Sequence, residues 1–318
     1  MHKLDLTEWL STTEWADWDR HPVTGDASAR RYERLIGPKG QSVIAMDAPP
    51  DICGTQKSFV DMARHLKNID LTAPEIFAWD EELGLLILSD LGAMDFAQHL
   101  NSTPSDETTL YGNAVNVLRK LHSTPPPINL AKMTPEIGTS MIDLAFEWAA
   151  IDISAELRAS IETELHKFLT QVDPSPNALS LRDFHAENLI WRSEQTGTDC
   201  VGLLDFQDAF ITHPTYDLAS LLRDARRDVL ADMLDGLLYQ LNPNADQDAQ
   251  RLAFHIMGVQ RNLRILGIFR RLAGRDGKTR YLDFIPRVEN HLRTDLSFPE
   301  LAKLNTLVTR AFFKGPSL

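Results

Sequence analysis

Cysteine is scarce in this chain of 318 residues. Only Cys53 and Cys200 occur, and they lie far apart without a C-x-x-C spacing. This usage argues against a disulfide framework and against a zinc site built on cysteines. It is typical of a protein kept in a reducing, intracellular compartment.

Positive charge and long apolar runs are also in short supply. The 32 basic and 45 acidic residues give a net charge of −13, which argues against binding to the nucleic-acid backbone. The acidic balance is compatible with a cationic substrate, although a charged surface that only aids solubility would look the same. No run is long enough to span a bilayer, and acids within the first eight residues argue against a signal peptide. We therefore expect a cytoplasmic protein with no nucleic-acid or membrane partner.

The most informative stretch covers residues 179–207. It reads L-S-L-R-D-F-H-A-E-N-L-I-W-R, then a polar turn, then V-G-L-L-D-F-Q. The apolar runs Leu189–Arg192 and Val201–Phe206 flank a turn at Ser193–Asp199 that contains glycine. This pattern predicts a β-hairpin.

Three polar residues bracket the predicted hairpin. Asp183 and Asn188 precede its first strand, and Asp205 ends its second strand. Each alone is an ordinary turn residue, but their order around a hairpin indicates phosphoryl transfer. In that chemistry Asp183 is the catalytic residue that orients the acceptor hydroxyl, while Asn188 and Asp205 hold Mg²⁺ against the phosphates of ATP.

This run resembles the catalytic and metal loops of the aminoglycoside phosphotransferase family, small-molecule kinases related in fold to protein kinases. The resemblance places Asp183 on the catalytic Asp, and Asn188 and Asp205 on the metal ligands. The segment His213–Ala219 matches a helix start that buttresses the catalytic loop. One departure is Arg182, since aminoglycoside enzymes commonly carry glycine there.

Longer motifs resemble a bacterial subgroup, the sugar-1-kinases that act on N-acetylmuramate and N-acetylglucosamine in cell-wall recycling. The likeness covers about residues 23–293. The motifs are G-D-A-S-A-R-R-Y, M-D-A-P-P, R-D-F-H-A-E-N-L-I-W, L-L-D-F-Q-D-A and R-D-G-K-T-R-Y-L.

The resemblance implies an α+β, bilobal, protein-kinase-like fold. We expect an N-lobe over residues 1–90, with an antiparallel sheet that covers the nucleotide, and a larger, mainly helical C-lobe over residues 91–318, with the active site in the cleft. The loop from Gly25 to Ser28 would bind phosphates through its backbone. The strand exit at Ser89, Asp90 and Leu91 would bind adenine.

One position departs from the kinase pattern. The strand Ser42–Asp47 carries Met46 where kinases usually supply a lysine for the α- and β-phosphates. The nearest cations are Arg30, Arg31 and Arg34, and our hypothesis is that Arg31 or Arg34 substitutes. Solvated surface arginines remain the alternative.

A late helix is expected to face the substrate. It covers about residues 246–272 and places Gln260, Arg261 and Arg264 on one face. Arg261 or Arg264 could bind an acidic substrate such as the lactyl carboxylate of N-acetylmuramate, with structural ion pairing as the alternative. Asp208 is a further candidate contact, and His185 is expected to fix loop geometry.

Other helix signals are local. Ser58 is expected to cap a helix to about Lys67, Ser154 to cap another, and Pro214 to open a third that runs through Asp224. We find no internal repeat, low-complexity tract or flexible linker.

These observations favour an enzyme that transfers the γ-phosphate of ATP to a small-molecule hydroxyl, most simply the anomeric hydroxyl of an amino sugar. An aminoglycoside O-phosphotransferase is the first alternative. A non-catalytic nucleotide-binding protein is the second, motivated by Met46. The intact set of Asp183, Asn188 and Asp205 argues against it.

Overall fold

The computed structural model describes residues 2–23, 29–151 and 153–313. The chain divides into two compact units, each described here by itself. Unit 1 comprises Met1–Phe96 and Asn188–Asp208, and unit 2 comprises Ala97–Glu187 and Ala209–Leu318. The functional division into lobes at residues 1–90 and 91–318 remains a prediction, because compactness does not show which part covers a nucleotide. Within the described residues, no helix is both long and apolar enough to cross a membrane.

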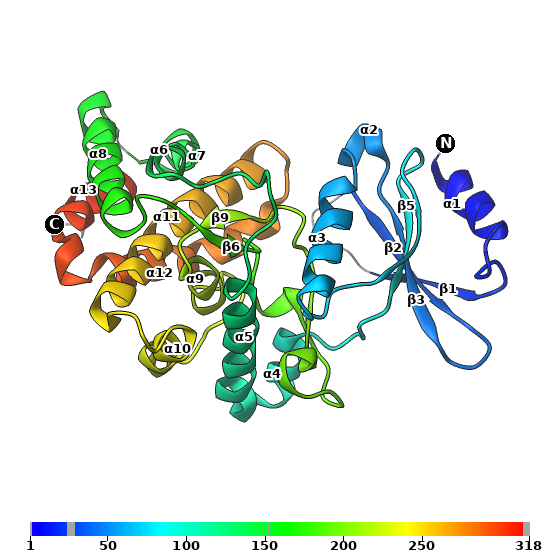
Figure 1. Ribbon diagram of the computed structural model, residues 1–318. Coiled ribbons are helices and arrows are strands. Elements are labelled where there is room, and N and C mark those ends of the chain that lie inside the picture. The colour runs from blue at the N-terminus through cyan, green and yellow to red at the C-terminus, as the bar shows by residue number, and fades with distance from the viewer. Residues whose placement is uncertain (1, 24–28, 152, 314–318) are drawn as a thin grey trace. The chain divides into compact units, whose positions relative to one another are not determined.

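Unit 1 is built on an antiparallel sheet (Figure 1). Its five strands are ordered β1-β2-β3-β5-β4, and every neighbouring pair is antiparallel. The strongly apolar strand β5 lies between β3 and β4. The elements are α1 (His2–Ser11), β1 (Asp19–Val23), β2 (Arg31–Ile36), β3 (Ser42–Asp47), α2 (Pro50–Cys53), α3 (Lys57–Asn68), β4 (Ile76–Asp80), β5 (Leu85–Ser89), β7 (Leu189–Trp191) and β8 (Val201–Leu203).

The two faces of this sheet have different neighbours. On one face Leu6 and Leu10 of α1 pack against a cluster made of Leu35, Val43, Ala45, Leu85 and Ile87. Figure 1 shows α3 on the other side of the sheet. Because successive strand residues point to opposite faces, Met46 belongs to the face away from this cluster. Tyr32 lies directly opposite Met46 in the β2–β3 register and therefore shares that face.

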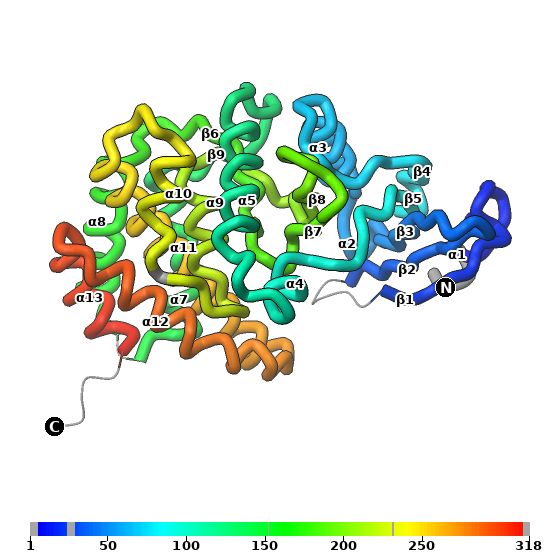
Figure 2. Tube along the Cα trace, turned by 90° about the horizontal axis from the view of Figure 1, so that it is seen from below, coloured from blue at the N-terminus to red at the C-terminus, as the bar shows by residue number. Residues whose placement is uncertain are grey.

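The predicted hairpin is confirmed by β7 and β8 (Figure 2). They pair antiparallel, with Leu189 opposite Leu203. The hairpin belongs to unit 1 because the amide of Leu203 donates to the carbonyl of Thr72 at 2.8 Å. In addition, the rings of Phe206 and Phe59 stack at 5.1 Å.

Unit 2 is mainly helical and is organised around α11. Helices α7, α8, α9, α10 and α12 pack against α11, and Nε2 of Gln260 in α11 donates to the carbonyl of Gly138 in α6 at 3.0 Å. At Gly267 the backbone of α7 comes so close that a Cβ would lie 2.3 Å from the carbonyl carbon of Leu144. The elements are α4 (Phe96–Ser102), α5 (Glu107–His122), α6 (Pro135–Ser140), α7 (Asp143–Trp148), α8 (Ala155–Val172), β6 (Ala178–Ser180), β9 (Phe210–Thr212), α9 (Tyr216–Leu222), α10 (Leu234–Leu241), α11 (Gln247–Gly274), α12 (Ile285–Leu296) and α13 (Ala302–Phe312), with α4 beginning on the last residue of the first segment of unit 1. Short 3₁₀ helices occupy Pro104–Asp106, Ala186–Asn188, Gly197–Cys200, Ala231–Met233, Thr279–Phe284 and Pro299–Leu301.

The predicted helix starts were right in one case and wrong in two. The hydroxyl of Ser154 caps α8 by accepting from the amide of Leu157 at 3.2 Å. Ser58 is not a cap, because α3 already begins at Lys57. Pro214 does not open α9, which begins at Tyr216 and ends at Leu222.

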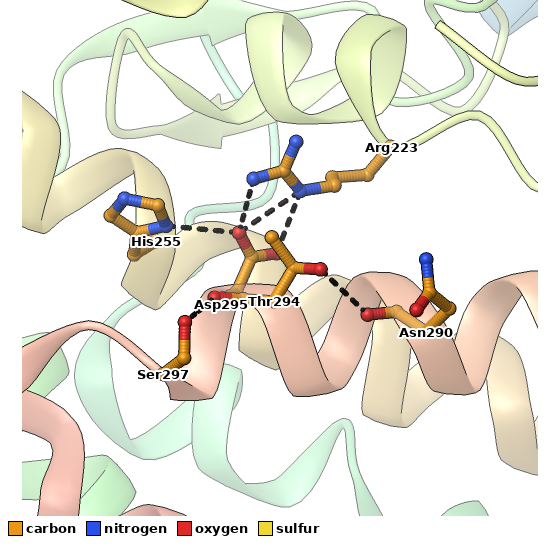
Figure 3. Close-up of polar contacts among 6 residues, drawn as sticks. All are labelled: Arg223, His255, Asn290, Thr294, Asp295 and Ser297. Atoms are coloured by element: carbon orange, nitrogen blue, oxygen red, sulfur yellow. Dashed lines mark hydrogen bonds and ion pairs between the residues drawn. The ribbon is translucent and has the colours of Figure 1, made fainter. Parts of the chain in front are cut away.

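A buried ionic cluster ties three helices of unit 2 together (Figure 3). Asp295 of α12 is fully buried and accepts hydrogen bonds from Arg223, at 2.7 and 2.9 Å, and from His255 at 2.9 Å. Arg223 follows the end of α9, and His255 lies in α11. Gly258 makes room for the carboxylate, since a Cβ there would lie 2.2 Å from Oδ2 of Asp295.

Candidate functional site

Asn188 and Asp205 lie at neighbouring ends of the β7–β8 hairpin in unit 1. The carbonyl of Asn188 accepts from the amide of Leu204 at 3.0 Å, which holds the two strand ends together. Asp205 has a φ of 57°, in the left-handed region. Aspartate adopts this region more readily than most residues, but it still costs about 1–2 kcal/mol. Such strain is concentrated at functional positions.

The chemistry of these two side chains fits Mg²⁺. This cation takes one or two carboxylates and fills its remaining positions with water and phosphate oxygens, and here one carboxylate and one amide oxygen sit on adjacent strand ends. Nε2 of Gln207 donates to Oδ1 of Asp205 at 2.6 Å. In the part of the chain that the structure describes, no group of three or more His, Cys, Asp or Glu side chains could hold a metal ion.

Asp183 lies in a loop of unit 2 that Asp217 holds in shape. Asp217, at the start of α9, accepts from the hydroxyl of Ser180 at 2.6 Å and from the amides of Leu181 at 2.7 Å and Arg182 at 3.1 Å. The loop turns tightly, since the amide of Asp183 donates to the carbonyl of Leu181 at 2.9 Å. The helix start that was expected to buttress the loop therefore does so through one carboxylate.

Two further features show how constrained this loop is. Arg182 has a φ of 71°, a conformation that explains why glycine is common at this position in the aminoglycoside enzymes that the sequence resembles. Asp217 is 1% exposed. Burial raises the pKa of Asp217 to about 6, although its hydrogen bonds to Ser180, Leu181 and Arg182 oppose the rise.

A second contact holds the far end of the same loop. The guanidinium of Arg226 lies 3.3 Å from Nε2 of His185 and 2.8 Å from Oε2 of Glu187. His185 is buried, and burial lowers its pKa well below the ordinary value, helped by the positive charges of Arg226 and Arg261. A neutral, weakly basic imidazole fits the geometric role expected of it.

The structure brings Arg261 and Arg264 of α11 together with Asp183 in unit 2. Tyr216 is fully buried, and its hydroxyl lies within electrostatic range of Arg264, Arg261, Arg182 and Asp183. Burial also lowers the pKa of Arg264. Arg261 is only 4% exposed, so it is not a solvated surface arginine. Within the part of the chain that the structure describes, neither Nη1 of Arg261 nor the hydroxyl of Tyr216 has a hydrogen-bond partner.

The two arginines expected to bind phosphate form ion pairs with carboxylates of unit 1. Arg31 donates to Asp47 at 2.7 Å. Arg34 donates to both oxygens of Asp90, at 2.6 and 3.1 Å. Burial raises the pKa of Asp90, but its hydrogen bonds, chiefly from Arg34, outweigh burial and leave the pKa below the ordinary value.

The remaining predicted positions are placed only in part. Gly25 and Ser28 lie outside the described residues. Ser89 ends β5, and its hydroxyl accepts from the amide of Glu75 at 2.8 Å. Leu91 follows two residues later and is partly buried. Asp208 is exposed and is the last residue of the second segment of unit 1.

Sequence reasoning did not identify Arg226. It lies 41 residues from His185 in a charged run, R-D-A-R-R-D, that looks like a solvated surface. Only the fold reveals that this arginine contacts the loop that follows Asp183. The motif starting at His213, by contrast, did point to Asp217.

Comparison with known proteins identifies the family of this chain. The model of the phosphotransferase enzyme family matches residues 19–255. The N-acetylmuramate/N-acetylglucosamine kinase of Caulobacter vibrioides is 35% identical over 345 aligned residues, which cover 95% of this chain and 94% of that protein.

Two solved structures share the fold. A choline/ethanolamine kinase family protein from Mesorhizobium loti superposes with a TM-score of 0.67 at 14% identity, covering 98% of this chain and 99% of that one. The ADP-bound aminoglycoside phosphotransferase APH(2'')-Ib gives 0.63 at 14% identity, covering 91% and 97%. The α+β, protein-kinase-like fold expected from the sequence is thereby confirmed, and the non-catalytic alternative is set aside. With a family match across most of its length, the chain belongs to the phosphotransferase enzyme family and is a small-molecule kinase.

Proposed function

We propose that the protein transfers the γ-phosphate of ATP to the anomeric hydroxyl of an amino sugar, N-acetylmuramate or N-acetylglucosamine. The observation that carries this proposal is the 35% identity to the Caulobacter kinase across 95% of the chain. The sequence motifs that resemble the same sugar kinases support it. A role in cell-wall recycling, in the cytoplasm where ATP is available, is part of the proposal.

The roles of the polar residues follow from phosphoryl-transfer chemistry. Asp183 orients the acceptor hydroxyl and takes its proton, and the hydrogen bonds of Asp217 fix the loop that carries it. Asn188 and Asp205 are the residues that would hold Mg²⁺, which neutralises charge on the phosphates when it is bound. The backbone of Ser89, Asp90 and Leu91 is proposed to bind adenine.

The charges near Asp183 favour an acidic acceptor over a cationic one. Arg182, Arg261, Arg264 and Asp183 all lie within electrostatic range of the Tyr216 hydroxyl, so three of these four charged side chains are positive. A carboxylate-bearing acceptor such as N-acetylmuramate would pair with a guanidinium through two hydrogen bonds, and it would satisfy Nη1 of Arg261. A polycationic aminoglycoside would be repelled by the same arginines. Asp208 remains a proposed polar contact to the acceptor.

The test is Mg²⁺-dependent phosphate transfer from ATP with a panel of acceptors. N-acetylmuramate, N-acetylglucosamine, glucose and kanamycin would each be incubated with enzyme, and the products identified by mass spectrometry and by the loss of reducing-end reactivity that follows anomeric phosphorylation. We expect sugar 1-phosphate from the two N-acetylated sugars and none from kanamycin. The D183N variant is the control for contaminating kinase. Product with kanamycin alone would replace the proposal with its first alternative.

Arg261 and Arg264 can be tested within the same panel. If they hold the lactyl carboxylate, R264Q should raise the KM for N-acetylmuramate about 10-fold or more, while the KM for N-acetylglucosamine, which lacks the carboxylate, stays within about twofold. R261Q gives the parallel test at a more buried position. Equal increases for both sugars would show that the arginines do not recognise the carboxylate.

A further inference from the structure

The strand of unit 1 that usually carries a phosphate-binding lysine in kinases has Met46 at that position, so another cation must bind the phosphates. Met46 is 1% exposed and has no charge to offer, yet the phosphates of a nucleotide need cationic partners besides the metal. A replacement must reach the face of the sheet on which Met46 lies. Tyr32 is on that face, because it is directly opposite Met46 in the β2–β3 register.

Neither Arg31 nor Arg34 is well placed to replace the lysine. Arg31 is adjacent to Tyr32 in the strand, so its side chain points to the opposite face, where it pairs with the buried carboxylate of Asp47. Arg34 shares a face with Tyr32 but lies two residues, about 7 Å, further along the strand. Its guanidinium is occupied by a two-oxygen contact with Asp90. Releasing either arginine would leave a largely buried carboxylate without its cation.

Arg30 is placed differently. Its guanidinium hydrogen-bonds the Tyr32 hydroxyl, and that hydroxyl lies within electrostatic range of Asp205. Tyr32 thus connects Arg30 both to the face of Met46 and to the neighbourhood of the proposed metal ligand. In phosphoryl transfer, the metal and the cationic side chain bind oxygens of the same phosphate chain. A cation next to the metal ligand is therefore where a substitute for the lysine is needed.

We propose that Arg30, oriented by the hydroxyl of Tyr32, replaces the strand lysine and binds the phosphate oxygens of the nucleotide. This revises the sequence-based assignment to Arg31 or Arg34. It rests on the proposed use of a nucleotide but not on the identity of the acceptor. A guanidinium can donate two parallel hydrogen bonds to phosphate, so its contact differs in geometry from that of a lysine.

The test compares nucleotide affinity in matched variants by isothermal titration calorimetry, without any acceptor. R30Q should bind Mg·ATP and Mg·ADP about 10- to 100-fold more weakly than the wild type, the loss typical of one charge-assisted hydrogen-bonding partner. Binding of adenosine, which has no phosphate, should be unchanged. R31Q removes the same kind of side chain at the adjacent position, is the matched control, and should change Mg·ATP affinity less than about threefold. Y32F should weaken Mg·ATP binding by several-fold, and R30K should recover part of the loss.

Two outcomes would overturn the inference. One is Mg·ATP affinity in R30Q within about twofold of the wild type. The other is an equal loss for adenosine and ATP, because a merely structural role would damage the whole nucleotide site. Circular dichroism of each variant would establish that it is folded. Since no sugar is present, failure here is distinct from failure of the proposed acceptor, which the product assay measures.

Discussion

Replacing Asp295 by asparagine should be among the most destabilising conservative changes in unit 2. The carboxylate is fully buried and accepts from Arg223, whose side chain is 13% exposed. In D295N the guanidinium keeps its charge but loses its counter-charge, and removing one partner of a buried pair costs about 3–5 kcal/mol. That is a large part of the roughly 5–15 kcal/mol that stabilises a folded protein.

The assay is chemical unfolding followed by circular dichroism, with the midpoint and slope fitted separately. A matched control exists in the exposed pair of Arg287 and Asp228, whose Nε–Oδ1 distance is 2.7 Å and whose aspartate is 88% exposed. D228N removes the same kind of contact at a solvent-exposed position and should lower the free energy of unfolding by less than about 1 kcal/mol. The difference between D295N and D228N isolates the effect of burial.

A double-mutant cycle adds a sharper criterion. In R223M combined with D295N, no charge is left without a partner, so the double variant should be less destabilised than the sum of the two single variants by at least about 2 kcal/mol. Two results would refute the reasoning. The first is that D295N lowers the free energy of unfolding by no more than D228N does. The second is that the losses of the two single variants, R223M and D295N, add up to the loss of the double variant.

Three further predictions concern Asp183, the Asp217 carboxyl that holds its loop, and the packing around Asp295. D183N should reduce kcat to background while the Kd for Mg·ATP, measured by calorimetry, changes less than about threefold, and a comparable turnover rate would contradict the role assigned to Asp183. For Asp217, the folded-state pKa of about 6 lies above its ordinary value of 3.8, so ionisation opposes folding and wild-type stability should fall by up to about 3 kcal/mol as the pH rises from about 4 to 6. D217N lacks this carboxyl, so its free energy of unfolding, measured by denaturant titration at each pH, should depend less on pH than that of the wild type. Its kcat should be at least about 10-fold lower. Equal slopes of the unfolding free energy against pH for both proteins would refute this. G258A would place a Cβ 2.2 Å from Oδ2 of Asp295 and should lower stability by about 1–3 kcal/mol, whereas G236A, where a Cβ meets nothing within 4 Å, should not.

The hairpin could be predicted, and the phosphoryl-transfer residues could be proposed, because both signals are local. Two apolar runs around a glycine-containing turn suffice to predict β7 and β8, and the order of Asp183, Asn188 and Asp205 is readable without coordinates. Their chemistry follows from residue type. Local signals also predicted the cap at Ser154.

Charge partners could not be predicted in the same way. The pairing of Arg34 with Asp90 depends on the order of the strands, which brings together residues 56 positions apart. Arg31 and Arg30 look equivalent in sequence, yet Arg31 pairs with Asp47 across the β2–β3 register, whereas Arg30, which precedes the strand, contacts the hydroxyl of Tyr32. The start of α3 was also misjudged: the helix begins at Lys57, and the side chain of the preceding Gln56 donates to the carbonyl of Ala48, eight residues earlier.

The composition of unit 1 from two separate segments has a consequence for biosynthesis. When Phe96 leaves the ribosome, the sheet strands β1 to β5 are complete, but Phe59 still lacks Phe206. At roughly 5–20 residues per second, the second segment, which ends at Asp208, follows about 5–20 s later. Until then the apolar surface around Phe59 is uncovered in the nascent chain, and a chaperone that shields it would have a defined window in which to act.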